Sequence, residues 1–184
     1  MHGAASSASA WIQRWAHLVP PQGTVLDVAC GAGRHGRWFS ERGHKVSAVD
    51  RDSEATAGLI AANPLIDVRV ADIEAGPWPF AGQTFDAVVV TNYLWRALTP
   101  TLIASVAPGG VLLMETFALG QASVGRPRNP EFLLQPGEWL QILPGLRIVA
   151  FEDGFVDAPE RFVQRVAAVR ERTDAAAPPR HRLA

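Results

Sequence analysis

Three acidic residues and two glycines stand at spacings that suggest a ligand site. Asp27 lies inside a short apolar run, and Gly31 and Gly33 follow it within six positions. Because glycine lacks a Cβ, Gly31 and Gly33 allow the backbone to turn sharply and to approach a ligand closely. Asp50 comes 17 positions after Gly33, at the end of a second apolar run, where a carboxylate can accept hydrogen bonds from both hydroxyls of a ribose. Asp72 follows a third apolar run, so the pattern predicts a site for a nucleoside-containing ligand.

The spacing Gly31-x-Gly33-x-x-Gly36 is compatible with two kinds of ligand. In dinucleotide-binding proteins, such a turn places a pyrophosphate at the N-terminus of a helix. Asp27 argues against this interpretation, because a buried carboxylate directly before the turn repels a pyrophosphate. The same carboxylate favours a cationic ligand, or one that offers an amino group and hydroxyls. A strand, turn and helix that bind no ligand are the remaining alternative.

The elements expected to position these residues alternate along the chain. Ser9 is the expected N-cap of a first helix, in which Trp11 and Trp15 belong to an apolar stripe that packs on the sheet or lines a pocket. Ser53 and Thr99 are the expected caps of two later helices, and the proline-rich segment 76–80 shortens or replaces a crossover helix. Strands are expected over 24–29, 45–49, 66–70, 85–91, 111–117, 146–151 and 162–169, with helices over 33–42, 53–63, 99–106 and 138–143. This alternation predicts an α/β fold with a doubly wound sheet.

Two motifs resemble those of a known family. The run Asp27-x-Ala29-Cys30-Gly31-x-Gly33 resembles the first motif of the class I S-adenosylmethionine-dependent methyltransferases. The run Pro79-Phe80-x4-Phe85-Asp86 resembles their fourth-strand motif. The resemblance covers residues 23–118, and the remainder is loosely similar to small bacterial enzymes near the tellurite-resistance and thiol methyltransferase group. It implies a Rossmann-like, mostly parallel seven-stranded sheet with an antiparallel closing strand.

The same resemblance implies S-adenosylmethionine as the cofactor. Asp27 would then hold the amino-acid end, Asp50 the ribose, and Asp72 with the amide of Ile73 the adenine. The alternatives are a helix cap for Asp50 and a solvated loop carboxylate for Asp72. The cofactor-binding candidates are Asp27, Ala29, Gly31, Gly33, Asp50, Arg51, Asp72, Ile73 and Thr91.

Methyl transfer from a sulfonium needs little acid or base, so the enzyme mainly has to hold the acceptor in line with the methyl group. An acceptor that is nucleophilic near neutral pH, such as a thiolate or an amine, suits this chemistry. Tyr93, Glu115 and His17 are possible proton acceptors. The polar loop 120–130 is long enough to be functional or is simply solvated. Its two arginines indicate an anionic acceptor. The catalytic candidates are Tyr93, Glu115, Arg126 and Arg128.

Two other functions compete with this prediction. One common form of NAD-dependent oxidoreductase uses a Tyr-x-x-x-Lys pair, but Tyr93 is followed four positions later by Ala97. A non-catalytic domain that binds S-adenosylmethionine, as a sensor or partner subunit, would keep the same binding residues. Detectable methyl transfer to any acceptor would distinguish an enzyme from such a domain.

The whole sequence sets further expectations. Its 184 residues predict one domain over 1–172, with an N-terminal cap helix in 1–20 and a disordered tail over 173–184. A formal net charge of −1 disfavours a nucleic-acid partner and leaves a small-molecule acceptor. No apolar run approaches the length of a membrane span, no targeting segment is visible and the single cysteine, Cys30, suits a reducing compartment, so a cytoplasmic protein is expected. The five histidines are scattered and suggest no metal site, and the sequence does not indicate an oligomeric state.

Overall fold

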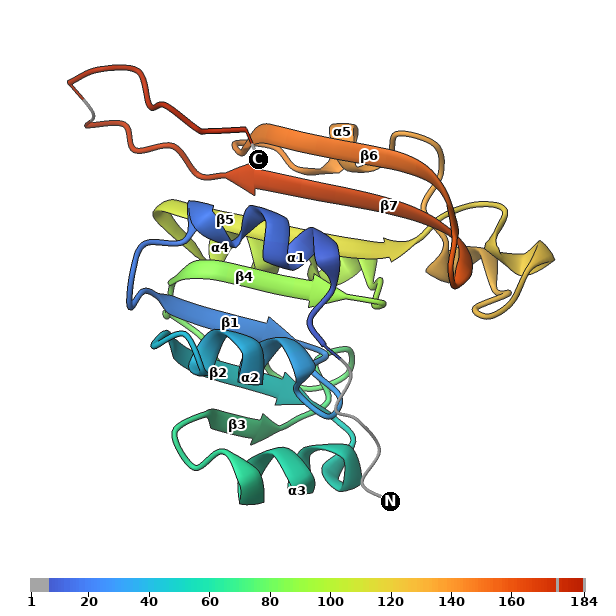
Figure 1. Cartoon of the computed structure of the whole chain (residues 1–184), viewed down its shortest axis with the longest axis horizontal. Coiled ribbons are helices and arrows are strands. Elements are labelled where there is room, and N and C mark those ends of the chain that lie inside the picture. Colours follow the sequence, from blue (N-terminus) through green and yellow to red (C-terminus); the bar gives the residue numbers. More distant parts are fainter. Residues whose placement is uncertain (1–6, 175, 184) are drawn as a thin grey trace.

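The computed structural model describes residues 7–174 and 176–183, which form one seven-stranded sheet flanked by helices. The strands are β1 (Thr24–Val28), β2 (Lys45–Asp50), β3 (Asp67–Val70), β4 (Phe85–Thr91), β5 (Val106–Phe117), β6 (Arg147–Asp157) and β7 (Glu160–Val169). Their order across the sheet is β3-β2-β1-β4-β5-β7-β6 (Figure 1). The pairs among β1 to β5 are parallel, whereas β7 runs antiparallel to both β5 and β6. The predicted mostly parallel, doubly wound sheet with an antiparallel closing strand is therefore confirmed.

Helices cover both faces of the sheet. They are α1 (Ala10–Trp15), α2 (Arg34–Ser40), α3 (Ser53–Ala62), α4 (Thr99–Ala104) and α5 (Trp139–Ile142). In Figure 1, α1 and α2 lie in front of the sheet, α4 and α5 lie behind it, and α3 lies beside the edge strand β3. One apolar cluster joins the front helices to the sheet and contains Trp11, Phe39 and Leu59. A second cluster contains Leu102 and Trp139 and fills the opposite face.

The first helix packs against the sheet. Of the two alternatives for its apolar stripe, packing on the sheet or lining a pocket, the structure shows the first. Trp11 and Trp15 are 3% and 2% exposed, and the indole Nε1 of Trp11 donates a hydrogen bond to the Val166 carbonyl of β7. Ser9 caps the helix, because its side chain accepts from the amide of Ile12. The tryptophans are therefore core residues.

Two predicted helix caps were wrong. Asp52, and not Ser53, caps α3, because its carboxylate accepts hydrogen bonds from the amides of Glu54 and Ala55. Thr99 was expected to cap α4, but a 3₁₀ turn, η2 (Arg96–Leu98), leads directly into that helix. The reason is that a cap needs extended backbone before the helix, whereas Leu98 already has helical dihedral angles.

Several strands are longer than their apolar patterns predicted. β5 begins at Val106 and includes the segment 108–110, which was expected to be a turn, and its register with β4 shifts between Phe85 and Ala87. β6 and β7 continue pairing out to Asp157 and Glu160, well beyond the predicted ends. The added segments contain glycine, proline or charged residues that interrupt the apolar pattern, such as 108–110 in β5 and 152–154 in β6. As expected, residues 71–84 connect β3 to β4 without a helix.

The turn between β1 and α2 depends on the packing of Gly33. This residue has a φ of +71°, which favours glycine, and a Cβ there would overlap the methyl groups of Leu59 on α3. Gly33 is also buried, so the close contact between α2 and α3 excludes any side chain. The second glycine of the motif therefore allows α2 and α3 to pack closely.

We expect Gly33→Ala to lower the free energy of unfolding by more than the roughly 1–3 kcal/mol of backbone strain alone, because the new methyl group meets Leu59. In a Leu59→Ala background, the same substitution should cost only the strain. Gly43→Ala is the matched control, since Gly43 has a φ of +84° with no atom within 4 Å of its Cβ position. Urea denaturation of the four variants and the wild type measures this coupling, and equal costs of Gly33→Ala in both backgrounds would contradict it.

Candidate active site

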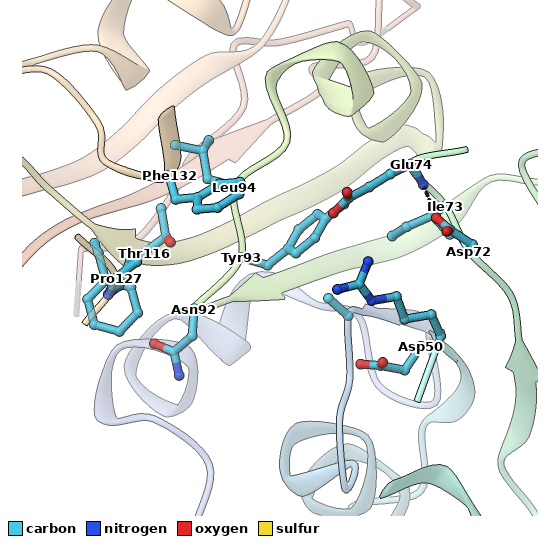
Figure 2. A pocket seen from close by; sticks show the side chains of 13 residues that line it. Asp50, Asp72, Ile73, Glu74, Asn92, Tyr93, Leu94, Thr116, Pro127 and Phe132 are labelled. Carbon is cyan, nitrogen blue, oxygen red and sulfur yellow. Dashed lines mark hydrogen bonds between the residues drawn. The ribbon is translucent and has the colours of Figure 1, made fainter. Parts of the chain in front are cut away.

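A cavity of about 310 Å³ opens at the carboxyl ends of the parallel strands (Figure 2). Its wall contains the residues that end or follow β1, β2, β3, β4 and β5, which is where open α/β sheets bind ligands. The lining residues are Ala29, Asp50, Arg51, Asp72, Ile73, Glu74, Asn92, Tyr93, Leu94, Thr116, Phe117, Pro127 and Phe132. Five of the predicted cofactor-binding residues and Tyr93 are among them.

The two ends of the cavity differ in chemistry. In Figure 2, Asp50, Asp72 and Ile73 lie at one end. Thr116, Pro127 and Phe132 lie at the other end, and Asn92 and Tyr93 lie between the two groups. Charged side chains thus line the end next to β2 and β3, and the end next to β5 is lined by uncharged ones. We call these the charged end and the apolar end.

Asp27 lies beneath the glycine turn and is 1% exposed. Its Oδ2 accepts a hydrogen bond of 2.8 Å from the amide of Gly36, whose missing side chain permits this contact. Burial raises the pKa of the Asp27 carboxyl to about 7, against the opposing effects of the Gly36 amide and the Arg34 guanidinium. A cationic group bound beside the turn would stabilise the carboxylate form.

Asp50 connects the ends of β1 and β2. Its Oδ2 accepts a hydrogen bond of 2.7 Å from the amide of Gly31, and its Oδ1 accepts one of 2.9 Å from the amide of Asp52. Gly31 has a φ of +52°, and no atom lies within 4 Å of the position that a Cβ would take. Ala29 beside it has a φ of +53° and lines the cavity. The turn therefore leaves an open place next to a carboxylate with lone pairs to spare.

Asp72 and its neighbours form the outer wall of the charged end. The Asp72 Oδ1 accepts hydrogen bonds from the amides of Glu74 and Ala75, which hold the pKa of this carboxyl below its usual range. Ile73 and Arg51 line the cavity next to it. An apolar side chain and a carboxylate at this position suit a flat base that carries an amino group.

Thr91, unlike the other candidates at strand ends, contacts the protein and does not line the cavity. Its Oγ1 lies 3.4 Å from Nδ1 of His35, and Nε2 of His35 accepts a hydrogen bond from the backbone amide of Ser9. His35 is 1% exposed, and burial lowers its pKa to about 3, so the ring is neutral. Thr91 and His35 therefore connect the end of β4 to the segment before α1.

The three predicted proton acceptors do not fit that role. Tyr93 lines the cavity, but its hydroxyl is buried beside the Glu74 carboxylate, and burial and that carboxylate raise its pKa. Glu115 is fully buried and forms a 2.6 Å ion pair with Arg165. It does not line the cavity, because side chains alternate along β5 and Thr116 faces the site instead. His17 is exposed and does not line the cavity, and its ring nitrogens lie near the carbonyls of Arg14 and Arg182.

The loop 120–130 reaches the cavity through Pro127 and not through its arginines. Arg126 and Arg128 are exposed and do not line the cavity, so the predicted contact with an anionic acceptor has no support from their positions. Buried Gln121 anchors the loop, since its side chain accepts from the Phe162 amide and donates to the Arg126 carbonyl.

Arg96 anchors the segment that follows this loop. Its guanidinium forms a 2.6 Å ion pair with Glu138 and donates to the carbonyls of Glu131 and Leu133. These bonds hold η4 (Pro130–Phe132) in place, and this short 3₁₀ helix carries Phe132 to the cavity.

Sequence reasoning missed several lining residues, most of them at the apolar end. Asn92 has a φ of +55° directly after β4, and asparagine after an apolar run is a usable signal for such a bend. Thr116 and Phe117 lie at the C-terminal end of β5, which was predicted correctly, so only the face of the sheet that each side chain occupies was unknown. No feature of the sequence indicated that Pro127 and Phe132 would line the cavity. The residues missed are Glu74, Asn92, Leu94, Thr116, Phe117, Pro127 and Phe132.

Comparison with known proteins agrees with this geometry. Residues 25–110 match the family model of a methyltransferase domain. A ubiquinone biosynthesis O-methyltransferase of Xanthomonas axonopodis pv. citri (strain 306) is 32% identical over 110 residues, which are 55% of this chain and 46% of that protein. The chain spans less than half the length of the curated relatives it matches.

Solved structures share the fold. TehB from Haemophilus influenzae superposes with a TM-score of 0.74 and 18% identity over 89% of this chain and 63% of that chain. An S-adenosylmethionine-dependent methyltransferase from Mesorhizobium loti gives a TM-score of 0.68 and 20% identity over 91% of this chain and 99% of that chain. Residues 25–110 are thus similar to a methyltransferase domain, and the whole chain has the fold of the solved S-adenosylmethionine-dependent methyltransferases. The resemblance inferred from the sequence is thus confirmed, and the likeness of fold includes TehB.

Within the described ranges, 7–174 and 176–183, no helix is long and apolar enough to cross a membrane. The same part of the chain holds no group of three or more His, Cys, Asp or Glu side chains that could bind a metal ion.

Asp27 should make the free energy of unfolding depend on pH. Its folded pKa, near 7, lies above the unfolded value of 3.8, so the folded protein holds a proton that the unfolded chain releases. Its contribution to stability therefore falls as pH rises from about 4 to about 7, by at most ~1.4 kcal/mol per pH unit, and is constant above that range. Asp27→Asn keeps an acceptor for the Gly36 amide but has no group that titrates. We therefore expect the free energy of unfolding of this variant to increase relative to that of the wild type as pH rises over this range.

Urea denaturation at pH 5, 6, 7 and 8 measures this difference. Asp157→Asn is the control, because that carboxylate lies exposed at the tip of the β6–β7 hairpin. A difference between Asp27→Asn and wild type that stays constant from pH 5 to pH 8 would show that the buried carboxyl does not titrate there.

Proposed function

We propose that this protein transfers a methyl group from S-adenosylmethionine to a small-molecule acceptor. The observation that carries the proposal is the open place at Gly31, which has a positive φ and no atom near its Cβ position. Buried Asp27 lies beneath this turn, and Asp50 borders it. A backbone free of side chains, flanked by two carboxylates, suits a ligand with an ammonium group and a ribose.

The chain's own residues fit such a cofactor along the charged end of the cavity. Asp27 would attract the ammonium group through the glycine turn, and the remaining lone pairs of Asp50 would accept from the ribose hydroxyls. Asp72 and Ile73 would hold the adenine, with Arg51 beside them. When bound, S-adenosylmethionine supplies an activated methyl group. The protein's part is to bind it, orient the acceptor and exclude water.

The site favours this function over an NAD-dependent one. A pyrophosphate at the glycine turn would lie next to the carboxyl of Asp27, and its negative charge would oppose ionisation of that group. A non-catalytic role as a sensor would keep the same cofactor site. The apolar end of the cavity, which is continuous with that site, supports the presence of an acceptor and therefore an enzyme.

The remaining expectations are part of the same proposal. A formal net charge of −1 supports a small-molecule acceptor over nucleic acid. The single cysteine, Cys30, is free and buried, which suits the reducing cytoplasm. We also propose that residues 1–172 act as one domain, with α1 attached to the sheet by its tryptophans.

We expect S-adenosylhomocysteine to bind wild-type protein and Gly31→Val to abolish binding, because the branched side chain fills the open place at the turn. Gly43→Val is the matched control: Gly43 also has a positive φ and open surroundings, so it carries the same backbone strain away from the site. Isothermal titration with S-adenosylhomocysteine and NAD side by side measures both affinities. Binding by folded Gly31→Val protein, or a preference for NAD, would refute the proposed cofactor site.

Asp50→Asn should weaken adenosine binding by about 1.5–3 kcal/mol, the size of a lost hydrogen bond to a charged group. Its effect on 2′,3′-dideoxyadenosine should be much smaller, since that nucleoside has no ribose hydroxyls to donate. Asp52→Asn is the control, because Asp52 caps α3 and does not line the cavity. If Asp50→Asn weakened both nucleosides equally, the carboxylate would act only by holding the Gly31 turn.

A further inference from the structure

The apolar end of the cavity contains one polar side chain whose hydrogen bonds are incomplete. Thr116 is 1% exposed, lines the cavity, and its hydroxyl has no hydrogen-bond partner within the described residues. Figure 2 shows it on the same side of the cavity as Leu94, Pro127 and Phe132. A buried hydroxyl without a partner costs free energy, and a ligand group that bonds to it removes that cost. Thr116 thus marks a point of polar contact inside an apolar surface.

The side chains around Thr116 suit a flat apolar ligand. Phe117, Pro127 and Phe132 contribute two aromatic rings and a pyrrolidine ring to the wall. Aromatic side chains of this kind pack well against a planar ring in a ligand. The loops that carry Pro127 and Phe132 are anchored by Gln121 and Arg96, so this surface is held in place before a ligand binds.

The charges around the cavity oppose an anionic acceptor. The charged lining residues within the described chain are three carboxylates, on Asp50, Asp72 and Glu74, and one guanidinium, on Arg51. Their formal sum is −2, and all four lie away from the apolar end. Arg126 and Arg128, which could have attracted an anion, do not line the cavity. An uncharged acceptor therefore avoids the repulsion that an anionic one would meet in this cavity.

Among the described residues, no side chain at the apolar end of the cavity could remove a proton before the transfer. Glu115 is paired with Arg165 on the other face of the sheet, and the Tyr93 hydroxyl is buried next to the carboxylate of Glu74. A neutral alcohol is a poor nucleophile without a base, and an alkyl amine is protonated near neutral pH and has no free lone pair. An aromatic amine is uncharged at that pH and keeps both a lone pair and an N–H.

We propose that the acceptor is an uncharged aromatic amine, whose N–H donates to Oγ1 of Thr116 while its ring packs on Phe117, Pro127 and Phe132. The inference rests on the proposed methyltransferase function. The amine lone pair forms the new N–C bond as the C–S bond breaks, and that electron pair stays on sulfur to give S-adenosylhomocysteine. The N-methylated product then loses its extra proton to water. Thr116 orients the nitrogen through its N–H, so that the lone pair faces the methyl group.

The substrate class is tested with four naphthalenes that differ in one substituent: an amine, a hydroxyl, a thiol and a carboxylate. We expect the amine to be methylated with a kcat/KM at least about tenfold above the other three, measured as S-adenosylhomocysteine formed. A preference for the hydroxyl, thiol or carboxylate compound, or no methylation of the amine, would overturn the inference. If S-adenosylhomocysteine binds to the same preparation, the proposed cofactor site still stands, and loss of that binding would refute the proposed function itself.

The role of Thr116 is tested with Thr116→Val, which keeps the shape and removes the hydroxyl. We expect kcat/KM for the amine to fall roughly tenfold, the equivalent of one hydrogen bond, with S-adenosylhomocysteine affinity within about twofold of wild type. Thr116→Ser should restore most of the activity, and Thr84→Val, at an exposed position before β4, should change nothing. Unchanged kinetics in Thr116→Val, or an equal loss of cofactor affinity, would overturn the assignment.

Discussion

The structure around the ligand-facing edge depends on one buried carboxylate. Asp27 is 1% exposed, and its burial is unfavourable enough to raise its pKa to about 7. The amide of Gly36 at 2.8 Å offsets part of this cost, and a Cβ at Gly36 would lie only 3.3 Å from the carboxylate. The start of α2 must therefore come close to β1, with a glycine at the point of contact. In the proposed function, a cationic group bound beside the turn offsets the remaining cost of this buried carboxylate.

The glycine turn is held from two further directions. Asp50 at the end of β2 accepts from the amide of Gly31 and fixes the first glycine of the turn. His35, on the first turn of α2, connects the amide of Ser9 to the hydroxyl of Thr91. Three strands and the segment before α1 thus meet at a turn that has almost no side chains of its own. This arrangement keeps the site open without leaving its backbone unsupported.

The division of the cavity into two ends follows from the strand order. β2 and β3 lie on one side of β1, and Asp50 and Asp72, at or just after their ends, line the cavity. β4 and β5 lie on the other side and contribute Asn92 and Thr116. The same sheet can therefore hold a charged, polar ligand and an apolar one next to each other. In the proposed reaction, the methyl group would pass from the cofactor in the charged end to the acceptor in the apolar end, at the point where the two ends meet.

The sequence by itself determined the succession of strands along the chain, the glycine turn and the three acidic residues. Apolar runs, glycines and capping residues act over a few neighbouring positions, so local patterns reveal them. The sequence did not determine which way Glu115 and Thr116 face, since that depends on the register with β7, which brings Arg165 opposite Glu115. Nor could it show that Pro127, and not Arg126 or Arg128, reaches the cavity, because contacts from Gln121 and Arg96 to distant segments place that loop. Local patterns specify elements, and only the packing of distant elements decides which side chains of an element meet a ligand.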